Sequence, residues 1–503
     1  MLARVRLPLL VFTAGASTLA AELSGARLLA PWFGASNLVW ANVIGLTLIY
    51  LSLGYWIGGK LADRYPTERT LGLVVVAAAV SLAILPLVLG PIFQMAQNAF
   101  ADLSAGAFVA SFLGTMLMFL VPITLLGMVS PWAIRLTITS VETAGSVAGR
   151  LYAISTVGSI LGTFLSVLVL IPAIGTRRTL FLIAAVLALA AVPLIGSRAV
   201  AAPVLLAALL LLPAGTIKTE AGETVLFEAE SPYQYVQISE RLGGERVLRL
   251  NEGWALHSVL PASRSALTGG IWDVFLTIPL LTGVPDARVA ILGNAGGTTA
   301  RGFRMLWPEV RVDGVEIDPV VTEAGNRYLD MQGPNLTVHE ADARFWLAGD
   351  RGPFDGIVVD AYRQPYIPFH LSTREFFEQA RDRLTARGVV MINVGAPPDE
   401  TAVVGRIAAT MRSVFPTVLM ARYEQFNSVI IGFRTATTTA RARDSLTTAT
   451  GIVGDPARRL APLLTSVVPG PDDDIFTDDH APVEQLTDGA ILDYLNNGAP
   501  GAS

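Results

Sequence analysis

The longest uncharged stretches of the chain lie in its first 215 residues, and they constrain the fold more than any other feature. A helix needs roughly 20 mostly apolar residues to cross a bilayer. A secretory signal would be followed by a soluble domain, whereas further apolar runs follow the first one here. We therefore expect residues 1–215 to form an α-helical transmembrane bundle of six or seven spans. The candidate spans are residues 7–30, 38–59, 70–94, 105–133, 147–172, 179–196 and 200–215.

Basic residues between the predicted spans indicate their orientation. Three lie in the loop at 60–69, whereas the loops at 31–37 and 95–104 contain no Lys or Arg. The positive-inside rule places the basic loops in the cytoplasm. Seven strictly alternating spans would put Arg177, Arg178 and the C-terminal part outside. Six spans with one re-entrant or interfacial segment avoid this, so we expect a multi-pass protein of the inner or plasma membrane with a cytoplasmic C-terminal domain.

Two ionisable residues, Glu22 and Arg27, fall inside the first predicted span. Charges at such a depth are costly, and they either pair with one another or serve a function. One hypothesis is a Glu–Arg pair that holds the first helix to its neighbours. The other is a role in transport.

Composition excludes several kinds of site. The chain has no cysteine, so disulfides, zinc–thiolate sites, iron–sulfur clusters and cysteine nucleophiles are ruled out. The net charge of −5, without a basic cluster, gives no indication of nucleic-acid binding. We expect no metal site, because the four histidines lack metal-ligand spacing. They are His257, His339, His370 and His480.

Residues 216–285 are expected to form a small antiparallel β unit. Alternating β-branched and aromatic residues at 224–227, 235–238 and 247–250 are typical of strands, and a Gly-Gly turn joins two of these runs.

From residue 286 to 435, strand patterns alternate with helical ones. Strands are predicted near 288–292, 310–315, 336–339, 356–359, 389–393 and 429–433, and helices near 298–306, 319–329 and 372–384. This alternation predicts a parallel, doubly wound Rossmann-type domain, similar to class I methyltransferases. Residues 436–503 are expected to be a helical and loop segment with a flexible tail.

Residues able to bind a nucleotide follow four consecutive predicted strands. The first strand ends in a Gly-rich loop, and glycines allow the backbone to approach a ligand closely. Glu316 follows the loop at about the spacing at which an acid reaches ribose hydroxyls. Asp342 can accept a hydrogen bond from an adenine amino group, and Asp360 ends the fourth strand. The predicted cofactor-binding residues are Gly293, Asn294, Ala295, Gly296, Gly297, Glu316, Ile317, Asp342 and Ala343.

The loop lacks a complete G-x-G-x-x-G pattern, since Asn294 and Ala295 follow its first glycine. A nicotinamide cofactor is therefore less favoured than an adenosyl sulfonium such as S-adenosylmethionine or its decarboxylated form.

Residues 224–435 resemble spermidine synthases, the polyamine aminopropyltransferases. Tyr233-Gln234 is similar to a Tyr-Gln pair of that family, and Val315–Asp318 matches its acidic strand end. The whole chain resembles bacterial proteins described as fused major-facilitator/spermidine synthase, which share the Gly59–Arg64 loop and blocks similar to 367–377 and 477–484. The resemblance implies aminopropyl transfer from decarboxylated S-adenosylmethionine to a diamine such as putrescine, with Asp360 as the catalytic acid–base group, no metal and a possible homodimer.

Two departures from the family leave alternatives open. Gly296 stands where the family has an Asp that holds the aminopropyl amine, and Arg363 stands near a lost second carboxylate. An S-adenosylmethionine-dependent methyltransferase is one alternative, and a polyamine transporter or sensor with a regulatory nucleotide-binding domain is the other. Tyr233, Gln234, Tyr362, Asp273 and Asp479 are the predicted substrate-binding residues, with Glu252, Asp478, Glu484 and Trp272 as further candidates.

Overall fold

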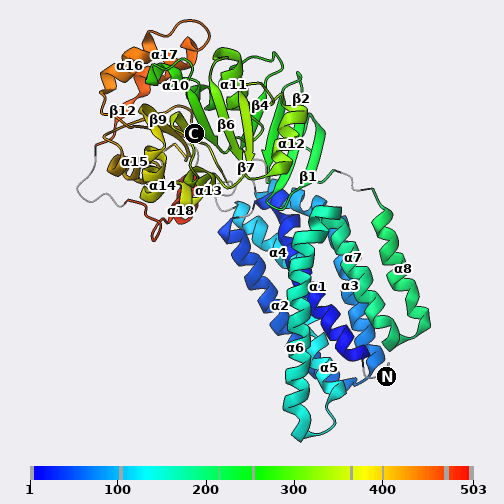
Figure 1. The fold of residues 1–503 in the computed structure, drawn as a ribbon. Coiled ribbons are helices and arrows are strands. Elements are labelled where there is room, and N and C mark those ends of the chain that lie inside the picture. The colour runs from blue at the N-terminus through cyan, green and yellow to red at the C-terminus, as the bar shows by residue number, and fades with distance from the viewer. Residues whose placement is uncertain are drawn as a thin grey trace. The chain divides into compact units, whose positions relative to one another are not determined.

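The computed structural model describes residues 5–34, 36–100, 106–213, 216–251, 255–362, 366–398, 401–468 and 475–497. The chain folds into two compact units (Figure 1). A helical unit contains Met1–Thr219 and Glu228–Tyr235, and an α/β unit contains Glu220–Phe227 and Val236–Ser503. The segment bounds predicted at 215, 285 and 435 stay a prediction.

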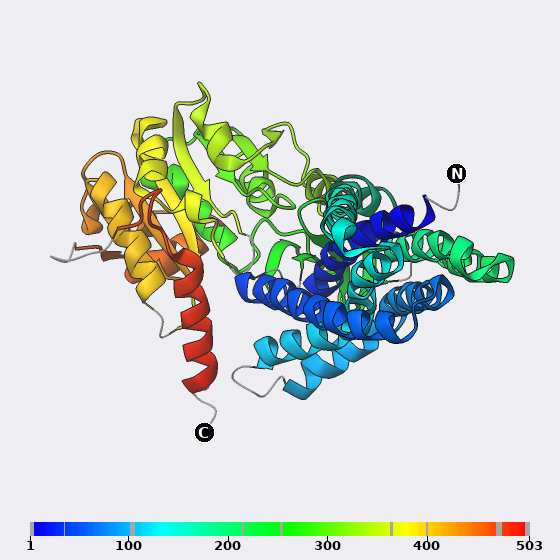
Figure 2. The same cartoon turned by 90° about the horizontal axis from the view of Figure 1, so that it is seen from below.

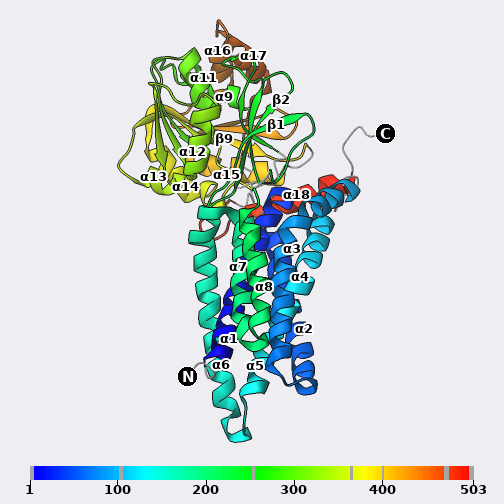
Figure 3. The same cartoon turned by 90° about the vertical axis from the view of Figure 1, so that its right-hand side faces the viewer.

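The helical unit consists of long helices that lie alongside one another (Figure 3). Each apolar run predicted as a span falls on helical structure. The helices are α1 (Arg6–Phe33), α2 (Asn37–Arg64), α3 (Glu68–Phe100), α4 (Gly106–Gly127), α5 (Val129–Thr137), α6 (Val141–Leu165), α7 (Ile171–Ile195) and α8 (Ala201–Ala208), with a π-helical stretch at Ser166–Leu170 between α6 and α7.

Among the described residues, five helical runs are long and apolar enough to cross a membrane, judged by length and composition. The sequence predicts six or seven, and the last runs account for the difference. Val141–Ile195 counts as one run, although Gly175 (φ 79°, ψ 162°) interrupts its helical backbone. The predicted span at 200–215 corresponds to a shorter apolar helix, Ser197–Leu211.

Helices α1 and α6 approach each other backbone to backbone through glycines. A Cβ built on Gly158 would lie 2.1 Å from the Phe12 carbonyl oxygen, and one on Gly162 would lie 2.1 Å from that of Ala16. The Ser159 hydroxyl donates to the Gly15 carbonyl at 3.1 Å. Small residues allow the two backbones to approach this closely. In an apolar surrounding, where the hydrophobic effect does not drive helices together, such close van der Waals packing stabilises the helix pair.

The α1–α6 contact predicts opposite effects for two identical substitutions on α6. Gly162→Ala should destabilise the protein by about 1–3 kcal/mol, because its methyl group meets rigid backbone. Gly149→Ala is the matched control: nothing lies within 4 Å of its Cβ. It should be neutral or stabilising by about 0.5–1 kcal/mol, because alanine favours the helix. Thermal unfolding in detergent would compare them, and equal melting temperatures would contradict the packing described.

A four-stranded sheet follows the first helices. Its strands are β1 (Glu223–Glu230), β2 (Tyr235–Arg241), β3 (Arg246–Leu250) and β4 (Leu256–Leu260), in the order β1-β2-β3-β4. β2 pairs antiparallel with β3, and β3 with β4. Gly243 and Gly244, both with positive φ, form the turn between β2 and β3.

An eight-stranded sheet forms the centre of the α/β unit, in the order β12-β10-β11-β9-β8-β5-β6-β7. Strands β5 to β9 are parallel, whereas β10, β11 and β12 are antiparallel. The strands are β5 (Arg288–Leu292), β6 (Arg311–Glu316), β7 (Leu336–Glu340), β8 (Phe354–Val359), β9 (Leu384–Gly395), β10 (Thr417–Arg422), β11 (Asn427–Phe433) and β12 (Thr465–Ser466).

The prediction of a wholly parallel sheet is therefore wrong at one edge. Only residues 423–426 separate β10 from β11, and so short a connection permits an antiparallel hairpin but no crossover. By contrast, the predicted strand at 288–292 and helix at 298–306 are confirmed with the same bounds, as β5 and α11.

Helices cover both faces of this sheet, because its inner strands are apolar on both sides. Ala290 and Leu292 of β5 pack on one face with α13 (Ala343–Ala348), α14 (Arg374–Asp382) and α15 (Ala402–Val414). Val289 and Ile291 pack on the other. The helices there are α9 (Trp272–Phe275), α10 (Ile278–Thr282), α11 (Thr298–Leu306), α16 (Thr439–Thr447) and α17 (Gly454–Leu463). Helix α12 (Pro319–Tyr328) packs on the small sheet, and α18 (Val483–Asn497), red in Figure 2, lies beside α15.

Candidate functional site

The carboxyl ends of four neighbouring parallel strands form the candidate site. In the sheet, β8, β5, β6 and β7 lie side by side, so the residues after each strand meet at one edge. Asp360, the Gly293–Gly297 loop, Glu316 and Asp342 follow these strands in that order. Ligands of doubly wound sheets bind beyond this edge.

The Gly-rich loop lies against the end of β8. The backbone N–H groups of Gly293 and Asn294 both donate to the Val315 carbonyl at 2.9 Å. Gly293 has φ +91°, and a Cβ there would lie 2.5 Å from the Cα of Ala361. Glycine is therefore required at this position for both its conformation and its size.

Glu316 is buried and fastens the same loop. One carboxylate oxygen accepts a hydrogen bond from the Ala295 N–H at 2.9 Å, and the other from the Asp318 N–H at 3.0 Å. Burial raises the pKa of Glu316 to about 7, although these hydrogen bonds oppose the shift. The carboxylate thus links the end of β6 to the loop after β5, beside the partly exposed Ile317.

Asp342 caps the N-terminus of α13. One of its carboxylate oxygens accepts from the Phe345 N–H at 2.9 Å, and the other lies 3.4 Å from the His370 imidazole. The neighbouring Ala343 is buried. The sequence named His370 only as one of four histidines without metal-ligand spacing, whereas the structure brings it to one of the predicted nucleotide-binding acids.

Asp360 lies in a network of amide and aromatic side chains. Its carboxylate accepts hydrogen bonds from the Asn393 amide, at 2.9 Å, and from the Trp272 side chain. Loss of hydration raises the pKa of Asp360 to about 7, and these two donors oppose the shift. Asn393 in turn accepts from the Asn427 amide at 3.0 Å. Asp360 thus combines a poorly hydrated carboxyl group with a fixed orientation.

Tyr362, two residues later, belongs to the same network. Its hydroxyl donates to the Asn393 carbonyl at 2.9 Å and accepts from the Gly395 N–H at 2.7 Å. Burial raises the pKa of Tyr362, so the hydroxyl stays protonated. Sequence reasoning missed Asn393 and Asn427; a polar residue at the end of the apolar run 389–392 was the available signal for the first.

Asp273 has a structural role in the α/β unit. Its carboxylate accepts from the backbone N–H groups of Thr268, at 2.9 Å, and Gly269, at 2.7 Å, and from the Thr268 hydroxyl. The side chain is buried, and these contacts account for its burial without a substrate. We therefore leave Asp273 out of the candidate amine site.

In the 477–484 block, the structure links the carboxylate of Asp478 to neighbouring segments. It forms two hydrogen bonds with the Arg344 guanidinium, at 2.7 and 2.6 Å, and accepts a third from the Thr373 hydroxyl at 2.7 Å. The bond with Arg344 lowers the pKa of Asp478. Asp479 is exposed. The Thr373 hydroxyl therefore joins the 367–377 and 477–484 blocks, and the Arg344–Asp478 ion pair adds a contact two residues after Asp342.

Tyr233 and Gln234 lie in the turn between β1 and β2, within the segment that folds with the helical unit. The Ser231 hydroxyl oxygen accepts from both of their backbone N–H groups, at 3.0 and 2.9 Å. Their role in binding an amine stays a prediction. Glu252 and Arg363 fall outside the described residues.

Asp360 should make stability depend on pH in a defined direction. In the folded protein its carboxyl keeps a proton up to about pH 7, compared with an ordinary pKa of 3.8. The folded state then binds more protons than the unfolded one between these values, so the free energy of unfolding falls as pH rises through them. Asp360→Asn should remove this part of the decline. The melting temperature of Asp360→Asn relative to wild type should therefore increase between about pH 4 and 7.

The control for the change in net charge is Asp350→Asn, at an exposed carboxylate. If both variants show the same pH trend, the burial of Asp360 does not affect stability as described.

Comparison with known proteins finds similarity in the C-terminal part of the chain. No model of a known protein family matches. A probable polyamine aminopropyl transferase of Bifidobacterium longum is 33% identical over 190 residues, which cover 38% of this chain and 42% of that protein. A polyamine aminopropyltransferase of Vibrio vulnificus is 38% identical over 140 residues, which cover 27% of this chain and 46% of that protein.

A putrescine N-methyltransferase of Nicotiana tabacum is 29% identical over 204 residues, which cover 38% of this chain and 51% of that protein. The chain thus spans about half the length, or less, of the relatives it matches.

Proposed function

We propose that the α/β unit is an aminopropyltransferase, which the helical unit holds at a membrane. It would transfer an aminopropyl group from decarboxylated S-adenosylmethionine to a diamine such as putrescine. The observation that carries this proposal is the poorly hydrated Asp360 beside the Gly293–Gly297 loop, at the edge that also holds Glu316 and Asp342. The named activity of the bacterial relatives supports the same reaction.

The nucleoside would lie along the strand ends from β5 to β7. Glu316 would bind the ribose hydroxyls, since a carboxylate that accepts two backbone bonds retains further lone pairs. Asp342 would accept from the adenine amino group through the oxygen that faces His370, because its other oxygen caps α13. Ile317 and Ala343 would contact the nucleoside next to these acids.

In the reaction, the amine nitrogen attacks the carbon bonded to the sulfonium. A C–N bond forms, the C–S bond breaks with its electrons on sulfur, and methylthioadenosine leaves. The nitrogen then loses a proton, which Asp360 accepts. A base works best when its pKa lies near the operating pH, and the value of about 7 for Asp360 suits this task. Asn393 and Trp272 would hold the carboxylate toward the amine, so that most of the rate comes from alignment.

The role of Asp360 predicts the loss of turnover without loss of nucleoside binding. Asp360→Asn should lower kcat by about 10²–10⁴-fold, because the amide cannot accept the proton. The Kd for methylthioadenosine should change little, since Glu316 and Asp342 remain. The matched control is Asp355→Asn at the opposite end of β8, where the carboxylate accepts from the Arg288 N–H and the Thr385 hydroxyl. Retained activity in Asp360→Asn would show that Asp360 is not the base.

Methyl transfer from S-adenosylmethionine is the second candidate, and Gly296 favours it. A Cβ at this position would lie 2.4 Å from the Leu329 side chain and 3.0 Å from that of Ser258. Neighbouring side chains therefore occupy the space where the family resemblance places an acid for the aminopropyl amine. The similarity to a putrescine N-methyltransferase supports the same alternative.

The nucleoside product distinguishes these two reactions. We would offer the detergent-purified full chain decarboxylated S-adenosylmethionine or S-adenosylmethionine, with a panel of diamines, and identify products by mass spectrometry. We expect methylthioadenosine, formed only with the decarboxylated compound and an amine. S-adenosylhomocysteine would establish methyl transfer instead, and Asp360→Asn serves as the blank for both.

A further inference from the structure

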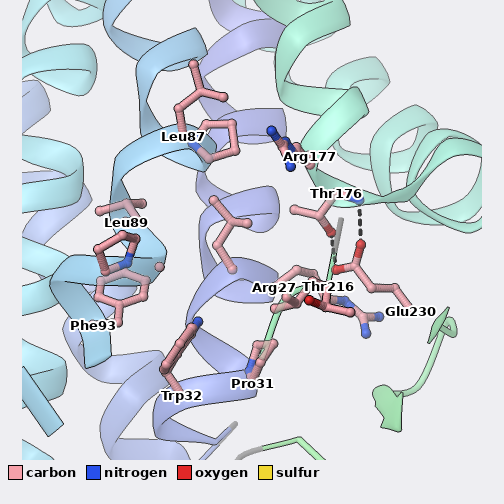
Figure 4. A pocket seen from close by; sticks show the side chains of 15 residues that line it. Arg27, Pro31, Trp32, Leu87, Leu89, Phe93, Thr176, Arg177, Thr216 and Glu230 are labelled. Carbon is pink, nitrogen blue, oxygen red and sulfur yellow. Dashed lines mark hydrogen bonds between the residues drawn. The ribbon is translucent and has the colours of Figure 1, made fainter. Parts of the chain in front are cut away.

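A cavity of about 280 Å³ lies within the helical unit (Figure 4). Helices α1, α3 and α7 line it, together with the chain at 216–217 and Glu230. Two of its lining residues are sequence features that the proposed enzyme does not use. Arg27 falls inside the first apolar span, and Arg177 departs from the charge pattern of the predicted loops.

Among the described residues that line this cavity, Glu230 is the one acid, and Thr176 donates to both of its oxygens. The Thr176 N–H and hydroxyl each donate to Glu230 at 2.6 Å, as the dashed lines of Figure 4 show. Thr176 follows the helix break at Gly175, so its N–H has no carbonyl one turn earlier, and a carboxylate there is favourable. The Glu230 carboxylate is thereby engaged by the protein itself, and burial raises its pKa.

Two guanidinium side chains, Arg27 and Arg177, line the cavity together with this carboxylate. The Arg27 guanidinium is fixed, since it donates to the carbonyls of Ser231, at 3.1 Å, and Pro232. Lys218 adds a further positive charge, 5.8 Å from the ring centre of the lining residue Trp32. The cavity therefore favours an anion, and guanidinium groups match the oxygens of a phosphate well.

Apart from Thr216, the rest of the described lining is apolar, and it continues onto the outside of α3. Leu87, Leu89 and Phe93 contribute to the cavity wall. Leu87 is 42% exposed, and the neighbouring Ile84 and Val88 are 46% and 41% exposed. The volume suits a headgroup and is too small for a whole lipid, whereas exposed apolar side chains beside it could contact acyl chains.

We propose that this cavity binds the phosphate headgroup of an anionic phospholipid, whose acyl chains lie along α3. The proposal depends on the membrane location of the helical unit and is independent of the reaction in the α/β unit. Basic pockets between transmembrane helices are a known form of lipid site. It would give Arg27 and Arg177 a shared role in an otherwise apolar bundle.

Native mass spectrometry of the detergent-purified full chain tests this proposal. Phosphatidylglycerol and phosphatidylcholine with identical acyl chains would be titrated onto wild type, Arg177→Gln and Arg178→Gln. We expect at least tenfold tighter binding of phosphatidylglycerol by wild type and a loss of that preference in Arg177→Gln. Arg178→Gln, which removes an equal charge from a residue outside the described lining, should bind like wild type. Equal binding of the two lipids by wild type would overturn the proposal.

A second variant guards against misfolding of Arg177→Gln. Gly90 lines the cavity, and its Cβ would lie 3.8 Å from the Trp32 ring, so Gly90→Leu fills the space while both arginines remain. It should reduce phosphatidylglycerol binding at least tenfold without lowering the melting temperature. Unchanged lipid binding in this variant would place the lipid elsewhere.

Inorganic phosphate distinguishes a lipid from a soluble anion. If millimolar phosphate displaces phosphatidylglycerol and binds as tightly, the site belongs to a soluble anion and the lipid proposal is wrong. The nucleoside-product assay, run on the same samples, keeps this result separate from the proposed reaction. Lipid binding without turnover would contradict only the proposed reaction, and turnover without lipid selectivity would contradict only the lipid site.

Discussion

The parallel pairing of β5 with β6 and β8 is the constraint on which the candidate site depends. The register of this pairing aligns Leu292 with Val315 and Val359, so the strands β5, β6 and β8 end at the same level of the sheet. The loop after β5 then has to pass over the end of β8, which leaves no space for a side chain at Gly293. The short distance between the loop and Asp360 is thus a consequence of strand register and one missing Cβ.

Burial and hydrogen bonding act against each other at the two central acids. Glu316 and Asp360 each accept two hydrogen bonds that favour the ionised form, yet loss of hydration prevails and brings both pKa values to about 7. Neutral donors can also favour the ionised form of a carboxylate, but at these two acids they do not offset the loss of hydration. Asp478 shows the contrast, because its partner is the Arg344 guanidinium and its pKa falls. Amide and indole donors therefore leave Asp360 able to exchange a proton near neutral pH, which an arginine in their place would prevent.

The sequence predicted the features that depend on local pattern. Apolar runs of the right length marked β5, and a glycine-rich turn followed by helix-forming residues marked α11. Glu316, Asp342 and Asp360 could be assigned to the same edge of the sheet, because parallel strands run in one direction and their carboxyl ends lie together. The helical runs of the first unit followed from hydrophobicity alone.

Contacts between distant segments were not accessible in this way. Asn393 reaches Asp360 only because β9 pairs with β8. Trp272, the other donor to Asp360, comes from the short helix α9, which precedes β5 in the chain. Asp273 looked like a site residue by its type, but its oxygens close the turn at Thr268 and Gly269. The antiparallel hairpin of β10 and β11 also escaped prediction, since only its second strand has a strong apolar pattern.

The break at Gly175 shows how the helical unit accommodates charge. A break inside an apolar helix frees backbone N–H groups, and leaving them without partners in lipid costs several kcal/mol, or roughly as much as a buried unsatisfied amide. Glu230 supplies the partner for Thr176, but a carboxylate brings a charge that itself needs compensation. Burial raises the pKa of Glu230, and Arg27 lies close enough to oppose that rise. The Ser231 and Pro232 carbonyls orient the Arg27 guanidinium. Each of these groups thus compensates a free-energy cost created by the previous one. Arg177 brings a second guanidinium group to the same cavity, and two guanidinium groups within an apolar helical unit are the physical reason to look for an anion at this place.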